Sequence, residues 1–477
     1  MSATIDAPLT LAEAAAALRD GTITAVDLLA AVTARADALD DQLGVYLHRF
    51  GAEAQEWAAQ ADADFAAGID RGPLQGVPVG VKDILAMSDG PTTAQSLVLD
   101  PAWGETDAIV VERLKAAGAV ITGKLSTMEF ASGLPDPDKP FPLPRNPWDV
   151  TTWPGGSSSG TGAGVAAGMF LCGIGTDTGG SIRIPAIFCG VSGLMPTYGR
   201  VPNAGCAPLG YSLDHIGPLA RSARDCALML STYMGADPRD HYAVDLPVPD
   251  LLARAGGSLE GLRIGVERAS HLGVVEGEDP AVEPAFEAAV ATLDALGATV
   301  VEVTLPHVAE TLTAGMITCS GESMAYHRND LVDRLGDYAR SNRSMYLLGA
   351  LFSGADYVQA QRVRRVTQRK LAATFADLDA IVMPAASVVA PGYDTLLAGD
   401  VMNVLGGVHT MYWDVVGNPA LVVPMGFNGR GLPLSLQIAA APFAEDVLVQ
   451  IGDAFQQATD WHLRVPPLAR EVGAAAA

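Results

Sequence analysis

Three segments of the sequence combine lysine or serine with glycine, which lets the backbone approach a substrate closely. Lys82 ends an apolar run, three consecutive serines occupy 157–159, and Ser181 follows two glycines. A serine hydroxyl attacks a carbonyl carbon once a base removes its proton, and an uncharged lysine can serve as that base. These residue types suggest acyl transfer through serine, and we expect neither a metal nor an organic cofactor.

Lys82 stands out because the chain contains only five lysines against twenty-five arginines. The apolar run 76–81 before it is predicted to be a buried strand. Burial lowers the pKa of a lysine because it disfavours the charged form, and the neutral amine is a base. The alternative is that Lys82 only ends the strand and pairs with the adjacent Asp83.

The serine-rich segment 154–160 precedes a run of alanine and glycine that is predicted to pack as a helix. Buried hydroxyls need hydrogen-bond partners, which argues against a plain linker. The residues themselves leave open which of Ser157, Ser158 and Ser159 takes part in chemistry.

Segment 175–185 follows a predicted strand at 170–175 and leads into a helix. Two glycines before Ser181 can present successive backbone N–H groups at the helix N-terminus, which is the geometry of an oxyanion hole. Asp177 and Arg183 flank this turn, and we expect them to form an ion pair with a structural role. Ser181 would then lie beside its own oxyanion donors.

Two other motifs are weaker matches to known sites. Segment 118–124 has the first spacing of a phosphate-binding loop, but Leu125 stands where such a loop needs serine or threonine. Segment 156–160 fits the GxSxG nucleophile elbow, yet no strand is predicted to run into it. The eight histidines are scattered, so no metal site is expected.

Strand-like and helix-like segments alternate along most of the chain, which predicts an α/β fold. Strands are predicted at 77–81, 119–122, 170–175, 262–266, 299–303, 380–383, 420–423 and 435–439. Helices are predicted near 107–117, 159–168, 281–296 and 445–459, and two more open the chain. We divide the chain into a helical N-terminal layer at 1–65, an α/β domain at 66–468 and a flexible tail at 469–477.

The composition limits the partners that we expect. The 477 residues carry a net charge of −24, which repels phosphate backbones and anionic lipid surfaces. The N-terminus lacks the pattern of a secretory signal, and no apolar stretch reaches 18 residues. We therefore predict a cytoplasmic protein that binds neither nucleic acid nor membrane.

Taken together, these segments resemble the amidase signature family, and the likeness extends over roughly residues 10–465. The matching motifs are 76–83, 107–110, 117–124, 129–131, 146–149, 155–160, 175–186, 214–218, 418–420 and 431–433. The resemblance implies a mixed central β-sheet covered by helices on both faces. It also implies that Lys82 is the base, Ser157 the bridging serine and Ser181 the nucleophile of an acyl-enzyme. The amides of Thr178, Gly179, Gly180 and Ser181 would form the oxyanion hole.

The substrate is predicted from residues near these motifs. Phe130, Leu134 and Trp153, with Trp148, suggest a pocket for a neutral, hydrophobic or aryl amide. The alternative is that each of these residues packs in the hydrophobic core. The same chemistry suits esters and carbamates. We expect a monomer or homodimer that acts on such small molecules.

Two alternatives remain open. The first is the glutaminase subunit of a tRNA-dependent amidotransferase, which works with a partner subunit. Leu125, Ser126 and Met195 depart from the usual family residues and argue mildly against it. The second is a non-catalytic binding protein on the same fold, which an intact set of Lys82 and serines argues against.

Overall fold

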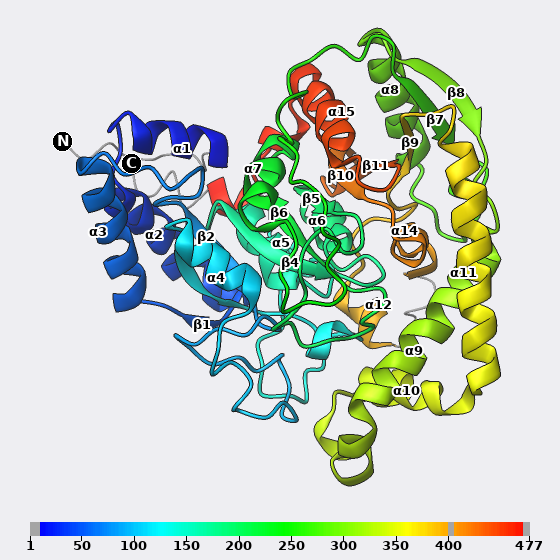
Figure 1. Cartoon of the computed structure of the whole chain (residues 1–477), viewed down its shortest axis with the longest axis horizontal. Coiled ribbons are helices and arrows are strands. Elements are labelled where there is room, and N and C mark those ends of the chain that lie inside the picture. The colour runs from blue at the N-terminus through cyan, green and yellow to red at the C-terminus, as the bar shows by residue number, and fades with distance from the viewer. Residues whose placement is uncertain (1–9, 399–404, 471–477) are drawn as a thin grey trace.

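The computed structural model describes residues 10–398 and 405–470, and its centre is one eleven-stranded sheet (Figure 1). The strand order is β1-β3-β2-β4-β6-β5-β10-β11-β9-β7-β8. The strands are β1 (Tyr46–Arg49), β2 (Pro78–Lys82), β3 (Val120–Leu125), β4 (Cys172–Asp177), β5 (Ser192–Met195), β6 (His215–Ala220), β7 (Arg263–Glu267), β8 (Thr299–Val303), β9 (Ala380–Pro384), β10 (Ala420–Phe427) and β11 (Pro433–Ala440).

The sheet is mixed. Strand β2 runs parallel to both β3 and β4, and β7 runs parallel to β8 and β9, whereas the strands between these groups pair antiparallel. Strand β1, which lies within the segment predicted as a purely helical N-terminal layer, pairs antiparallel with β3 at the edge. The predicted α/β fold with a mixed sheet is confirmed.

Helices cover this sheet on both sides and at both ends (Figure 1). They are α1 (Leu11–Arg19), α2 (Ala25–Leu43), α3 (Ala52–Ala66), α4 (Ile109–Ala116), α5 (Ser159–Ala167), α6 (Arg183–Cys189), α7 (Ala223–Tyr233), α8 (Val282–Ala295), α9 (Val308–Asp333), α10 (Arg340–Leu348), α11 (Gly354–Thr374), α12 (Tyr393–Leu397), α14 (Met411–Val416) and α15 (Glu445–Ala458). Helices α1 to α3 flank one end, and α9 to α11 flank the other.

Each predicted strand overlaps an observed one, but β1, β5 and β6 were not predicted. The reason is local: β1 and β5 have four residues each, and β6 contains both a glycine and a proline, which are typical of turns. These strands exist because neighbouring strands supply hydrogen bonds to them.

Alternate residues of the strands point into two different hydrophobic clusters, as the two-residue repeat of a strand requires. On one side, Leu421 and Val423 of β10 pack with α7, α8 and α15; on the other, Val422 packs with α5 and α6. The sheet is therefore buried on both faces.

Glycines of α5, β2 and β4 leave room for the side chains that pack between α5 and the sheet. A Cβ atom built on Gly164 of α5 would meet the Phe170 ring at 2.3 Å, and one on Gly80 of β2 would meet it at 3.0 Å. A Cβ on Gly173 of β4 would meet the Thr161 side chain at 2.6 Å. Phe170 thus fills a slot between α5 and the strands that carry the predicted site, and the small-residue run is explained by this packing.

No helix in the described ranges is long and apolar enough to cross a membrane. The part of the predicted tail beyond Arg470 lies outside the described residues. Ala469, by contrast, is buried, and its carbonyl accepts a hydrogen bond from Arg35.

Replacing Phe170 with alanine should destabilise the protein by about 3–5 kcal/mol, because the surrounding glycine backbones cannot collapse into the void. The measurement is the midpoint of urea unfolding. Leu351→Ala is the control, since Leu351 is 78% exposed, and its midpoint should stay unchanged. Equal midpoints for the two variants would show that the ring does not support α5.

Candidate active site

Lys82 lies at the end of β2 with its amine between two hydroxyl groups. Its Nζ atom is 2.7 Å from Oγ of Ser157 and 2.8 Å from Oγ1 of Thr176 on the adjacent strand β4. The side chain is fully buried. Burial lowers the pKa of Lys82 to about 7, and more distant negative groups do not offset that effect. A large neutral fraction of the amine is therefore present at neutral pH.

Asp83 does not pair with Lys82, so the alternative raised by the sequence is wrong. Its Oδ1 atom lies 2.8 Å from Nζ of Lys124, on β3, and both side chains are buried. Lys124 also donates to Oγ1 of Thr92. Burial lowers the pKa of Lys124 as well, but here the charge and hydrogen bond of Asp83 oppose the shift. Residues 120–124 of segment 118–124 lie within β3, so the segment is not a phosphate-binding loop.

The three consecutive serines have different partners. The hydroxyl of Ser157 faces Lys82, whereas that of Ser158 donates to the Thr176 carbonyl at 3.3 Å and that of Ser159 donates to the Gly155 carbonyl at 2.6 Å. The peptide bond before Ser157 is cis. Tertiary contacts thus distinguish Ser157 from its neighbours, which local sequence could not do.

Ser181 lies in the turn between β4 and α6. Its backbone carbonyl accepts a hydrogen bond from the amide of Ser158 at 3.2 Å, which ties the turn to the serine-rich segment. Ser181 is half-buried, while Lys82 and Ser157 are buried. Of the three predicted catalytic residues, Ser181 is the one that solvent reaches most readily.

Asp177 organises the turn before Ser181. Its carboxylate accepts hydrogen bonds from the amides of Gly180, Ile182 and Arg183, and it forms an ion pair with the Arg183 side chain at 2.9 Å. The geometry therefore contains the predicted Asp177–Arg183 pair. The amide of Gly180, predicted as an oxyanion donor, is directed at Asp177 instead. Among the described residues, the amides of Thr178, Gly179 and Ser181 have no hydrogen-bond acceptor.

Asp414 of α14 is a second buried carboxylate beside the same guanidinium. Its Oδ2 atom contacts Nη2 of Arg183 at 2.5 Å, and its Oδ1 atom has no donor among the described residues. Burial, together with the neighbouring Asp177 charge, raises the pKa of Asp414 well above its usual range. Burial opposes ionisation of Asp177 too, but the ion pair with Arg183 outweighs it and lowers its pKa. The two pKa shifts therefore run in opposite directions, toward the protonated form of Asp414 and toward the ionised form of Asp177.

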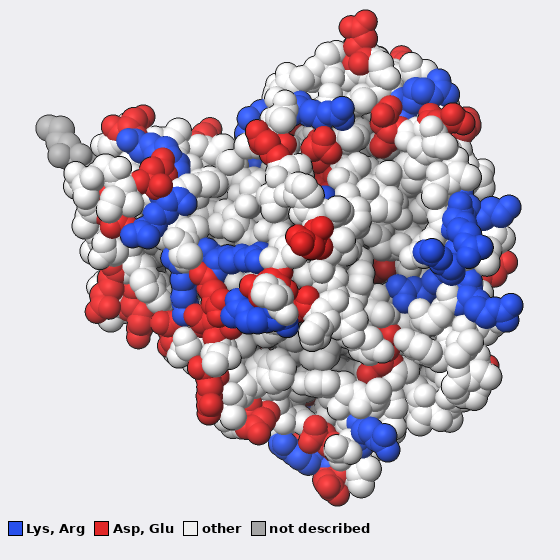
Figure 2. Space-filling model, viewed as in Figure 1, with Lys and Arg blue, Asp and Glu red and all other residues white. Residues whose placement is uncertain are grey.

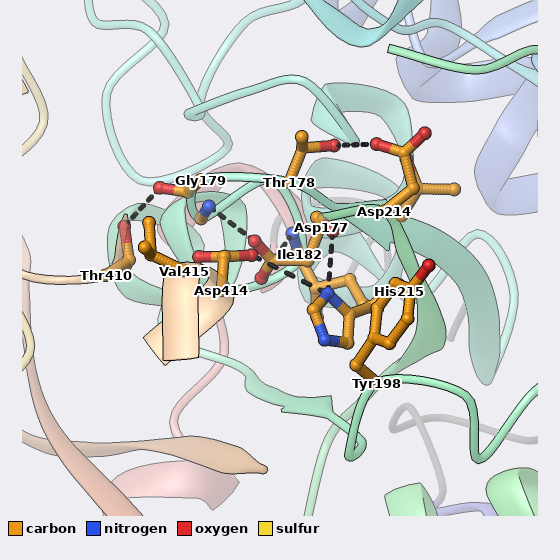
Figure 3. A network of polar contacts seen from close by, with 12 residues as sticks. Asp177, Thr178, Gly179, Ile182, Tyr198, Asp214, His215, Thr410, Asp414 and Val415 are labelled. Atoms are coloured by element: carbon orange, nitrogen blue, oxygen red, sulfur yellow. Dashed lines mark hydrogen bonds and ion pairs between the residues drawn. The ribbon is translucent and has the colours of Figure 1, made fainter. Parts of the chain in front are cut away.

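Further contacts surround the turn (Figure 3). The hydroxyl of Thr178 donates to Asp214 at 2.6 Å, and that of Thr410 donates to the Gly179 carbonyl at 2.7 Å. His215 lies with Nδ1 3.3 Å from the Asp177 carbonyl. Burial lowers the pKa of His215 to about 4, so its ring adds no charge at neutral pH.

The residues predicted to line a substrate pocket are not brought together. Phe130 packs against His327 and Tyr338, in the cluster formed by α9 and α10. Leu134 and Trp153 belong to the cluster around α5 and α6, where Trp153 contacts Phe188. Trp148 stacks obliquely on Phe427 and donates to the Cys189 carbonyl.

Sequence reasoning missed Thr176, Thr410 and Asp414. The sequence places Thr176 in the same motif as Asp177, so its position near the site could have been predicted, although its contact with Lys82 could not. Thr410 and Asp414 come from a segment more than 220 residues further along the chain. Nothing in their local sequence signals that they meet the turn.

Comparison with known proteins agrees with this geometry. The model of the Amidase family matches residues 27–449, and the chain belongs to this family. It is therefore an amidase-family enzyme that acts on carbon–nitrogen bonds.

The relatives include parts of a larger enzyme. A Chloroflexus aggregans protein, named as the A subunit of glutamyl-tRNA(Gln) amidotransferase, is 40% identical over 485 aligned residues, which cover 97% of this chain and 99% of its own length. The solved structure of the protein of that name from Thermotoga maritima has a TM-score of 0.79 at 28% identity and covers 95% of each chain. Another, described as a vestigial protein complex that reveals the origins of an s-triazine catabolic enzyme, has a TM-score of 0.87 at 32% identity and covers 94% of this chain and 98% of its own.

These relatives overturn two predictions. A hydrolase of hydrophobic or aryl amides, esters or carbamates is contradicted by relatives that are named as A subunits of a tRNA-dependent amidotransferase. A chain that acts alone on small molecules, without nucleic acid, is contradicted by the same names.

The structure explains why the substrate prediction failed. Leu125, Ser126 and Met195 are fully buried in or beside the sheet, so their identities reflect packing and carry no information about the substrate. Trp153 and Phe130 are core residues as well. The net charge does not predict the partners of this chain, because it describes the whole chain whereas a binding surface is local.

Activity should rise with pH through about 7, because deprotonated Lys82 is the form that can accept a proton. Lys82→Arg should lower kcat/KM by about 10²–10⁴-fold and remove this acidic limb, since a guanidinium stays protonated. The measurement is the rate of carbon–nitrogen bond cleavage against pH. Lys115→Arg, a matched change in an ion pair with Asp107, should keep the wild-type profile. A limb that persists in Lys82→Arg would assign the base elsewhere.

Asp414→Asn should be nearly neutral for stability and activity. An asparagine places an N–H where protonated Asp414 has its O–H, and its carbonyl can still accept from Arg183. Asp177→Asn should instead cost about 3–5 kcal/mol, because it leaves the Arg183 charge without its ionised partner. Thermal unfolding and the rate of carbon–nitrogen bond cleavage are measured for the two variants. If Asp414→Asn were as damaging as Asp177→Asn, Asp414 would be ionised.

Proposed function

We propose that this chain is the glutaminase subunit of a tRNA-dependent amidotransferase. The observation that carries the proposal is the 40% identity to the A subunit of glutamyl-tRNA(Gln) amidotransferase over 97% of this chain. In this role the chain hydrolyses the side-chain amide of glutamine. The ammonia is then used on a tRNA-linked acceptor that partner subunits hold.

The mechanism that we propose uses Lys82, Ser157 and Ser181 as a proton relay. Neutral Lys82 accepts a proton from Ser157, which takes one from Ser181 as the Ser181 oxygen attacks the amide carbon. The proton returns through Ser157 to the leaving nitrogen, because an amide anion cannot depart. Ammonia leaves, a glutamyl ester remains on Ser181, and water hydrolyses it. The 2.7 Å contact between Lys82 and Ser157 supports the first transfer.

The oxyanion of the tetrahedral intermediate is assigned to the amides of Thr178, Gly179 and Ser181. These amides have no acceptor among the described residues, whereas the amide of Gly180 is engaged by Asp177. Preformed donors of this kind stabilise the transition state because they need no reorganisation as charge develops.

The acidic character of the chain is compatible with this role. With a net charge of −24, the chain repels phosphate at long range. In the proposed complex, partner subunits hold the tRNA and this chain supplies ammonia, so most of its surface needs no positive charge.

The test is to assemble the chain with the other subunits of a glutamyl-tRNA(Gln) amidotransferase and measure formation of glutaminyl-tRNA(Gln). Wild-type complex should use glutamine or ammonium as the nitrogen donor. Ser181→Ala should lose the glutamine-dependent reaction by at least about 10³-fold, because the nucleophile is gone. The ammonium-dependent reaction should be unchanged, since free ammonia bypasses Ser181.

The ammonium reaction is thus an internal control for folding and assembly. Glutamine-dependent turnover by Ser181→Ala would reject Ser181 as the nucleophile. A wild-type complex that fails with glutamine but works with ammonium would reject the glutaminase assignment.

A further inference from the structure

Helix α11 carries a concentration of positive charge that the site does not use. Five of the 30 lysines and arginines of the chain lie within nine residues of this helix, at Arg362, Arg364, Arg365, Arg369 and Lys370. Arg364 is half-buried and donates to the Val415 carbonyl and to Ser212. The other four are exposed. Figure 2 shows blue side chains along the edge where Figure 1 draws α11.

These four cations form a single surface, which we call the α11 stripe. Arg362, Arg365 and Arg369 recur at three- and four-residue spacing, so they lie on one face of the helix, and Lys370 adjoins them. Among the ion pairs of the described residues, none includes any of the four. Arg362 and Arg365 donate only to neutral glutamines.

The stripe is locally unfavourable. Like charges four residues apart, such as Arg365 and Arg369, destabilise a helix by repulsion. The only acidic residue of α11 is Asp356. It belongs to the capping box at the N-terminus, where its carboxylate accepts a hydrogen bond from the Ser353 hydroxyl. The chain has 54 acidic residues, yet within the described ranges none of them forms an ion pair with the stripe. A local rule broken without compensation points to a function.

Apolar side chains lie within the same face. Val358 is 59% exposed and Val366 is 48% exposed, and Leu351, just before α11, is 78% exposed. Exposed valines beside arginines suit a protein surface better than a phosphate backbone, which offers no apolar contact.

We propose that the α11 stripe is the docking surface for an acidic, amphipathic segment of a partner subunit. Carboxylates of the partner would pair with the arginines, and its apolar side chains would cover Val358 and Val366. The proposal rests on the proposed function, because only a component of a larger enzyme needs such a partner. It adds where the partner binds and by what chemistry.

The test uses a triple neutralisation, Arg362→Gln, Arg365→Gln and Arg369→Gln. The Kd for the other amidotransferase subunits should rise at least about tenfold, and its dependence on salt should weaken, because charge pairs at an interface are screened by ions. The matched control is Arg239→Gln, Arg430→Gln and Arg464→Gln, which removes the same charge from exposed, ion-paired arginines elsewhere. That control should bind like wild type.

Each outcome decides between the proposals. If the stripe variant binds its partner subunits like wild type, the docking surface is rejected and the proposed function stands. If it keeps the subunits but loses affinity for tRNA, the stripe is an RNA site and the proposal is rejected. If wild type itself assembles with none of the other subunits, the proposed function fails, and the docking surface with it.

A second inference concerns Thr410 and is carried by different contacts. The peptide group between Gly179 and Gly180 is held at both ends: its carbonyl accepts from the Thr410 hydroxyl at 2.7 Å, and its N–H donates to Asp177. Figure 3 shows Thr410 and Asp177 on opposite sides of this peptide. A Cβ built on Gly180 would meet Oγ1 of Thr410 at 2.1 Å, so the contact is close.

Thr410 is itself rigidly placed. Its carbonyl accepts from Nη1 of Arg183 at 2.8 Å, and the preceding carbonyl, that of His409, accepts from Gln437 at the same distance. The side chain is buried. A held peptide fixes the directions of the amides on either side of it, which belong to Gly179 and Ser181.

We infer that Thr410 is a positioning residue that holds the oxyanion donors in line. Thr410→Val keeps the shape but cannot donate. It should lower kcat for glutamine about tenfold, the usual effect of one hydrogen bond, with KM nearly unchanged. Affinity for the glutamine analogue whose amide is replaced by a boronic acid should fall by the same factor, because its Ser181 adduct carries the anionic oxygen.

Thr410→Ser retains the hydroxyl and should restore both values, and the pH midpoint set by Lys82 should be the same in all variants. A Thr410→Val variant that raises KM at constant kcat would show contact with the substrate and reject the inference. A Thr410→Val variant with the kcat and the boronic-acid affinity of wild type would show that the hydroxyl is dispensable, and would reject it too. Circular dichroism verifies folding, and Thr410→Ala serves as a second variant without the hydroxyl.

Discussion

One buried guanidinium connects the parts of the molecule that form the site. Arg183, at the start of α6, reaches Asp177 at the end of β4, Asp414 on α14, the carbonyl of Thr410 and the side chain of Gln437 on β11. These groups come from separate places in the chain. Because a buried charge is tolerated only when it is paired and hydrogen-bonded, these partners together compensate the guanidinium beside the turn at Ser181.

The net charge around Arg183 depends on the pKa values of the two carboxyl groups beside it, those of Asp177 and Asp414. Two carboxyl groups face one guanidinium, and burial together with the Asp177 charge raises the pKa of Asp414, which favours its uncharged form. Asp177 stays ionised and is free to accept three backbone amides of the turn. The ion pair therefore determines the direction of the Gly180 amide, and through it the amides that remain available to a substrate.

Lys82, unlike Arg183, is buried without an ion-pair partner among the described residues. Its amine is buried without a contacting carboxylate, so its charge is disfavoured and its pKa falls to about 7. Lys124 on the neighbouring strand is equally buried but has Asp83 as its partner. Two lysines of similar burial thus differ in role because one is paired with a carboxylate and the other with hydroxyls. That contrast supports Lys82 as the base of the glutaminase that we propose.

The sequence by itself determined the fold class, most strands of the sheet and the segments that carry Lys82, the serines and the Asp177–Arg183 pair. Local periodicity and motifs of a few residues are enough to predict these features. The family resemblance pointed to Ser157, and the tertiary structure showed that its hydroxyl, and not that of Ser158 or Ser159, faces Lys82. Only the tertiary structure decided that Thr410 and Asp414 meet the turn. It also showed that Leu125, Met195 and Trp153 belong to the core. Such outcomes depend on contacts between segments far apart in the chain, where packing and the pairing of buried charges, rather than local residue preference, decide which side chains meet.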